Sequence, residues 1–98
     1  MKLDNFIKSP VERKRYTIDY SDWLDTGETI SSVTFAVTPT TTNTLEIDAY
    51  TLGTGNTTVI FFANFGDANI IYTVDVRIVT SGGQTKEDTI LFTVRSAT

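Results

Sequence analysis

Apolar and polar side chains alternate in short segments along most of this chain of 98 residues. Successive side chains of a β-strand point to opposite faces, so a period of two marks a strand with one buried face. No stretch keeps the period of about 3.6 that an amphipathic helix requires. The chain is therefore restricted to an all-β fold. Strands are predicted at residues 15–20, 29–37, 44–52, 57–65, 70–80 and 85–95.

Irregularities in the pattern predict local features of these strands. Ile30 has the opposite parity to the apolar residues that follow it, which predicts a β-bulge at residues 31–32. Leu45, Ile47 and Ala49 are expected on one buried face. The nearly continuous apolar run at 57–65 predicts a central strand covered on both faces.

Strand number and turn spacing together predict the fold class. About seven short strands in roughly 100 residues are typical of an immunoglobulin-like antiparallel β-sandwich, with an open barrel as the alternative. Tyr72 stands two positions before the inward Val74, where such a domain has a tyrosine corner; an ordinary core tyrosine is the other interpretation. Length predicts one domain, a sandwich over residues 16–98 preceded by a basic N-terminal arm over residues 1–15.

Charge is divided unevenly between these two parts. Residues 1–15 hold five basic and two acidic side chains, a net +3, whereas residues 16–98 hold three basic and ten acidic ones, a net −7. An acidic body without an aromatic ladder argues against nucleic acid as a partner. The basic segment is interpreted either as a solvated terminus or as an arm that docks on an acidic partner.

Absent residue types and motifs exclude several kinds of chemistry. The chain has no cysteine and no histidine, so it lacks thiolate nucleophiles, disulfides, the usual zinc ligands and the common neutral-pH base. The glycine-containing residues 51–58 lack the lysine and the helix of a phosphate-binding loop. No cofactor is therefore expected. Residues 1–10 contain no signal-peptide apolar region and no later run approaches membrane-spanning length, which predicts a protein made in the cytoplasm, without export by its own signal and without contact with a membrane.

An acidic segment, "DYSDWLDTGETI" at residues 19–30, surrounds the single tryptophan. Catalysis would need two carboxylates whose environments separate their pKa values, so that one acts as acid and the other as base. These carboxylates lie together at one strand end and in one turn, where ordinary solvation would leave all of them ionised. A calcium site would use hard oxygen ligands, but the spacing is not that of an EF-hand. The structural interpretation is a corner between two strands. Its carboxylates are Asp19, Asp22, Asp25 and Glu28.

In that corner, Ser21 is expected to cap a turn, Trp23 and Leu24 to cover one end of the sandwich, and Gly27 to release the chain into the next strand. Alternatively, Trp23 is an exposed anchor for a partner, since tryptophan and tyrosine are enriched at binding hot spots. The candidate partner-binding residues are Arg13, Lys14, Arg15, Tyr16, Tyr20, Trp23 and Leu24.

Two stretches, residues 8–39 and 72–95, resemble the fiber-tail adaptor proteins of tailed bacteriophages, most specifically at "DYSDWLDTGE" and "GGQTKEDTI". The resemblance implies an immunoglobulin-type, non-enzymatic virion protein that joins the tail or its nozzle to the tail fibers. It implies tail proteins as partners and several copies in a symmetric assembly. It also assigns Tyr20, Ser21, Asp22, Trp23, Leu24 and Gly27 to a signature corner that serves packing or docking.

Two other classes of function remain open. A capsid decoration domain or a carbohydrate-binding immunoglobulin-like domain is the first, and a glycan binder would need an exposed aromatic platform. The second is a small hydrolase or metal enzyme, which would lose its activity when Asp22 or Asp25 is changed.

Overall fold

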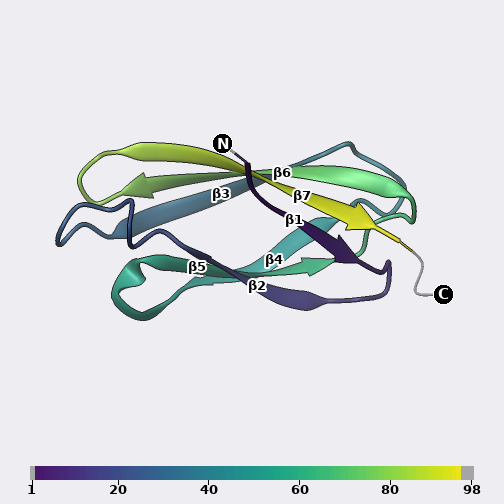
Figure 1. Cartoon of the computed structure of the whole chain (residues 1–98), viewed down its shortest axis with the longest axis horizontal. Coiled ribbons are helices and arrows are strands. Elements are labelled where there is room, and N and C mark those ends of the chain that lie inside the picture. The colour runs from purple at the N-terminus through teal and green to yellow at the C-terminus, as the bar shows by residue number, and fades with distance from the viewer. Residues whose placement is uncertain (1, 96–98) are drawn as a thin grey trace.

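Two β-sheets packed face to face form the computed structural model, which describes residues 2–95. Figure 1 shows β3, β6 and β7 in one layer above β2, β4 and β5 in the other. The prediction of an all-β sandwich of about seven strands is confirmed. No helix within residues 2–95 is long and apolar enough to cross a membrane. The elements are β1 (Lys2–Lys8), β2 (Lys14–Asp19), β3 (Ile30–Thr38), β4 (Glu46–Leu52), the 3-10 turn η1 (Thr54–Asn56), β5 (Thr58–Asn64), β6 (Ile70–Thr80) and β7 (Thr85–Val94).

Strand order identifies the sandwich as immunoglobulin-like. One sheet runs β1-β7-β6-β3 and the other β2-β5-β4. Apart from the first strand, this is the division of an immunoglobulin domain, in which strands B, E and D form one sheet and C, F and G the other. The first strand lies on the outer side of β7 and pairs with it in parallel, whereas the other neighbouring strands pair antiparallel.

The strand β1 was not predicted from the sequence. Its residues were assigned to the N-terminal arm, because charged side chains at Lys2, Asp4 and Lys8 obscure the alternation around Phe6. In the structure residues 2–8 pair with residues 89–94, and β2 already begins at Lys14. Only a short turn therefore lies free of the sheets between the two strands.

The predicted strand details are partly confirmed. The bulge in β3 occurs between Ile30 and Ser32, as expected. The regular alternation expected in β4 is wrong: its register shifts between Asp48 and Thr51, and Ala49 is exposed with a φ of 50°. A bulge inserts an extra residue, so the face of the following side chains changes. The strand β5 is central, as expected, but the predicted burial of both faces is wrong: only alternate residues are buried, and the residues of its outer face are half-buried.

An aromatic cluster ties the two sheets together across the core. The ring of Phe92 on β7 lies 5.4 Å from that of Phe6 on β1 and 5.1 Å from that of Tyr16 on β2, between ring centroids. Tyr16 also lies 4.6 Å from Phe6 and 5.8 Å from Phe61 on β5. Rings at these separations stabilise a core beyond the area that they bury.

Tyr72 forms a tyrosine corner. Its side chain is fully buried at the start of β6, and its hydroxyl accepts a 2.8 Å hydrogen bond from the backbone N–H of Asp67, five residues upstream. The same hydroxyl lies 2.6 Å from Oγ1 of Thr41. This is the arrangement found in immunoglobulin-type sandwiches, and it favours that interpretation over an ordinary core tyrosine.

We expect Tyr72→Phe to lower the free energy of unfolding by about 1–3 kcal/mol, because it leaves two buried or half-buried polar groups without their partner. Urea unfolding measures the loss. Tyr50→Phe, at a side chain that is 45% exposed, is the matched control and should change stability by less than about 0.5 kcal/mol. Equal effects of the two changes would contradict a structural role for the Tyr72 hydroxyl.

Candidate functional site

The corner between β2 and β3 is built from local hydrogen bonds. The backbone N–H groups of Trp23 and Leu24 donate to the carbonyl of Tyr20 at 2.9 and 3.0 Å. Oδ1 of Asp19 accepts from the N–H of Ser21 at 2.8 Å, so Asp19 caps the turn in place of the predicted Ser21. The backbone N–H of Ser21 and, to a smaller extent, the Ser21 side chain hold the pKa of the Asp19 carboxyl below its usual 3.8.

Trp23 and Leu24 turn back onto the sandwich as expected. Both are half-buried and pack against the core. Gly27, with a φ of 79°, then allows the chain to turn toward β3. The corner therefore covers one end of the sandwich.

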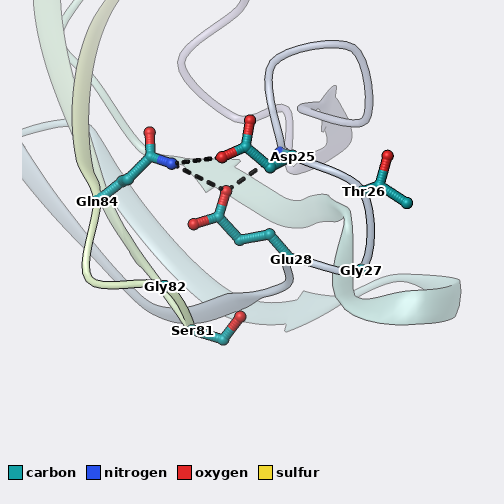
Figure 2. Close-up of a pocket in the computed structure, with 7 residues that line it drawn as sticks. All are labelled: Asp25, Thr26, Gly27, Glu28, Ser81, Gly82 and Gln84. Atoms are coloured by element: carbon teal, nitrogen blue, oxygen red, sulfur yellow. Dashed lines mark hydrogen bonds between the residues drawn. The ribbon is translucent and has the colours of Figure 1, made fainter.

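A hairpin from the other half of the chain meets this corner (Figure 2). Nε2 of Gln84, in the β6–β7 turn, donates to Oδ2 of Asp25 at 2.9 Å and to Oε1 of Glu28 at 3.4 Å. The Thr80 hydroxyl donates to the other Glu28 oxygen at 2.6 Å. Residues 25–28 of the corner and Ser81, Gly82 and Gln84 of the hairpin line a hollow of about 340 Å³ between the two segments. The corner and the hairpin are thus locked together by side chains more than 50 residues apart.

Glu28 is the centre of this junction. Hydrogen bonds from Thr80 and from the N–H of Asp25 hold the pKa of its carboxyl below the usual 4.5. A Cβ added at Gly82 would come within 2.5 Å of Oε2 of Glu28, so only glycine fits beside it without rearrangement. These oxygens are occupied by donors within the chain, so the arrangement stabilises the loops. Among residues 2–95, no three acidic side chains form a cluster that could hold a metal ion.

The lowered pKa of Glu28 predicts an acid-sensitive junction. A depressed carboxyl pKa stabilises the fold at pH values above 4.5, and this stabilisation disappears as the pH falls through the lower folded-state value. We therefore expect Glu28→Gln to lose less stability than the unchanged protein between pH 6 and pH 3, as measured by urea unfolding. Glu46→Gln on β4 controls for the loss of one carboxylate. Parallel pH curves for the protein and the Glu28 variant would contradict this role.

A second cluster of polar and aromatic side chains connects the corner to β7, and it was not predicted from the sequence. Asp88 on β7 is fully buried, with Oδ1 3.4 Å from Nζ of Lys86. Lys86 in turn lies 5.4 Å from the ring of Trp23. Burial raises the pKa of the Tyr20 phenol, and the nearby negative charge of Asp88 raises it further. Within residues 2–95, neither the Tyr20 hydroxyl nor the Asp88 oxygens make a hydrogen bond of good geometry. In the alternating pattern of β7, Asp88 falls on the same face as Ile90 and Phe92. This position could have predicted from the sequence that its side chain is buried.

The basic side chains near the N-terminus do not form one patch. Lys8 is buried, and its Nζ donates to the carbonyls of Ser9 and Phe65 at 2.7 and 2.6 Å. Burial lowers the pKa of Lys8, and the Glu12 carboxylate partly offsets this. Arg13 pairs with Asp48 at 2.9 Å, so much of the predicted positive charge is used within the domain.

The candidate partner-binding residues fall into two groups. Arg13, Lys14 and Arg15 are exposed at the start of β2. Tyr16 and Tyr20 are 7% and 3% exposed and belong to the core, because the inward parity of β2 carries them between the sheets. This corrects their interpretation as surface anchors. The half-buried Trp23 and Leu24 keep only part of their surface accessible.

The comparison with known families identifies the chain's relatives. The sequence model of a family described as "Podophage GP4 fiber-tail adaptor protein gp77" matches residues 8–93. The chain belongs to this fiber-tail adaptor family. The match spans the corner and the hairpin, the segments that the structure brings together through Glu28 and Asp88. Family membership makes the chain a structural protein of the phage tail, as the sequence resemblance implied.

Comparisons with individual proteins add little. No curated protein matches the chain. Among solved structures, a 2,6-sialyltransferase of Photobacterium sp. JT-ISH-224 in a ternary complex with CMP and lactose is similar at 13% identity and a TM-score of 0.49. The match covers 97% of this chain but only 18% of the enzyme, and a similarity this weak supports no inference about function.

Proposed function

We propose that this chain joins the phage tail, at its nozzle or adaptor ring, to the tail fibers through protein–protein contacts. The observation that carries the proposal is the family match over residues 8–93. A non-enzymatic role agrees with the corner, where the Glu28 and Asp25 carboxylates are held by internal donors. Several copies would act together in the symmetric ring of a tail.

The shape of the domain supports a bridging role. Its extents are 46 × 22 × 18 Å, and turns lie at both ends of the long axis (Figure 1). One end carries the β2–β3 corner with the β4–β5 and β6–β7 turns, and the other carries the β1–β2 and β5–β6 turns. Two separated ends allow two partners to be contacted at once. The exposed Lys14 and Arg15, with Arg13, are proposed to face an acidic neighbour.

Immunogold microscopy of intact particles, with antibody raised against this chain, tests the proposal. Label at the tail near the fiber bases is the expected result. Particles produced without the protein are the control and should remain unlabelled. Label over the capsid would indicate a decoration protein instead, and particles without label would exclude a virion component. Either of these two results would overturn the proposal.

A further inference from the structure

Among the edge strands of residues 2–95, β3 has the longest regular free edge, and it carries no charged side chain. This strand ends its sheet, pairs with β6 on one side only, and holds nine residues from Ile30 to Thr38. None of the nine is charged. An edge strand exposes a row of backbone N–H and C=O groups, which another extended chain can pair with.

The other three edge strands within residues 2–95 carry features that discourage pairing. The strand β1 is shorter than β3 and its register shifts between Lys2 and Asp4, and β2 begins with Lys14 and Arg15. A register shift between Asp48 and Thr51 interrupts β4. Lysines and bulges are the means by which sheet edges avoid unwanted pairing. In β3 the only bulge lies at Ile30–Ser32, so the remaining length stays regular.

Apolar side chains accompany this edge on the inner side of the sheet. Phe35 and Val37 point inward but remain half-buried, unlike the fully buried residues of β6 opposite them. Tyr50 of β4 is 45% exposed, and its ring centroid lies 5.9 Å from that of Phe35. The inward side chains of an added strand would cover these three residues and remove apolar surface from water.

A hollow of about 360 Å³ lies on the outer face of the same sheet and extends from β3 across β6 to Glu87 on β7. The small side chains of Thr34 and Ala36 form its β3 side, and the longer ones of Asp75, Arg77 and Glu87 surround it. Arg77 is neutralised by Glu87 at 2.7 Å, whereas Asp75, beside Ala36 in the register, accepts a 2.9 Å hydrogen bond from the Thr89 hydroxyl but forms no ion pair within the described residues. The hollow therefore has room and negative charge for a basic side chain.

We infer that the free edge of β3 takes up an extended, basic segment of another tail protein as an additional strand. This inference rests on the proposed function and names the kind of contact that it uses. Charge selects the occupant: the whole chain carries a net −4, so a second copy would be repelled where a basic segment is attracted. Apolar side chains at alternate positions of that segment would face Phe35, Val37 and Tyr50.

A synthetic peptide tests the inference directly. The probe has nine residues with blocked ends, and valine alternates with lysine. Added to ¹⁵N-labelled protein, it should shift amide signals mainly at residues 30–38 and slow the hydrogen exchange of alternate β3 amides by about tenfold or more. Two further peptides carry N-methyl groups, one on the valine amides and the other on the lysine amides. The amides of alternate residues point to opposite edges of a strand, so only one of the two sets can hydrogen-bond to β3, and only one of the two peptides should lose its binding. Binding by both, or shifts centred on another edge, would overturn the inference.

Matched lysine substitutions provide the test on the protein side. Ala36→Lys places a positive charge beside Asp75 and fills the hollow, so it should weaken peptide binding by about tenfold or more. Thr17→Lys, at an exposed position of the edge strand β2, should leave binding unchanged. Equal weakening by the two variants would count against the β3 edge. Concentration-dependent self-association that Ala36→Lys abolishes would identify a second copy as the occupant, which also overturns the inference.

The same variants separate this inference from the adaptor role. In particles, mass spectrometry should find less Ala36→Lys protein than unchanged or Thr17→Lys protein, relative to other tail proteins. If both variants are incorporated normally and gold label remains at the tail, strand addition at β3 is wrong while the adaptor role stands. If the unchanged protein is absent from particles, the adaptor role itself fails.

Discussion

Phe92→Ala is expected to lower the free energy of unfolding by about 3–5 kcal/mol, the usual cost of truncating a fully buried ring. Phe92 has no exposed surface, and its ring contacts those of Phe6 and Tyr16, which come from two other strands. The substitution therefore removes one of the rings that connect β1 and β7 of one sheet with β2 of the other, where Phe6 and Tyr16 also contact each other directly. Surrounding side chains cannot close the cavity without moving strands that are fixed by their backbone pairing.

Urea unfolding at neutral pH measures this loss, and Phe92→Leu is the matched control. Leucine retains much of the ring's volume, so we expect it to cost less than half as much as alanine. If alanine and leucine cost the same small amount, below about 1.5 kcal/mol, the packing described for this cluster would be incorrect.

The fold could be predicted because most strands have one buried face. In β6, the parity of Tyr72, Val74, Val76 and Ile78 predicted the strand with its observed bounds. The strand β1 does not show this signal, because its inward positions include Lys8, whose ammonium is satisfied by two carbonyls from turns far apart in sequence. A pattern of apolar residues cannot reveal a buried lysine. The bulge at Ala49 was missed for a related reason: a backbone irregularity leaves the residue types unchanged.

The candidate site was predicted as a corner, but not with its partner. Local features such as Trp23 and Gly27 indicated a turn that covers the sandwich. The contacts of Glu28 with Thr80 and Gln84 depend on which strands lie next to each other, and strand order does not follow from one sequence. The resemblance to fiber-tail adaptors was most specific at residues 19–28 and 82–90, and these two segments contact each other. Much of that signature is thus explained by packing between them.

Lys86→Met should destabilise the protein by about 3 kcal/mol, because it leaves the buried carboxylate of Asp88 without a cation. The pair spans 3.4 Å, and the side chain of Asp88 is 0% exposed while that of Lys86 is 19% exposed. The two single substitutions should therefore differ. Asp88→Asn removes the buried charge and leaves a lysine that can still reach water, so its cost should be the smaller one.

The double variant Lys86→Met with Asp88→Asn distinguishes an ion pair from simple loss of packing. If the unpaired carboxylate causes the loss, replacing it by a neutral amide should restore at least half of the stability lost by Lys86→Met alone, as measured by urea unfolding of all four proteins. Additive losses would show that the two side chains act independently. In that case Lys86 would contribute chiefly by covering Trp23, and the buried carboxylate would be stabilised by other groups around Tyr20.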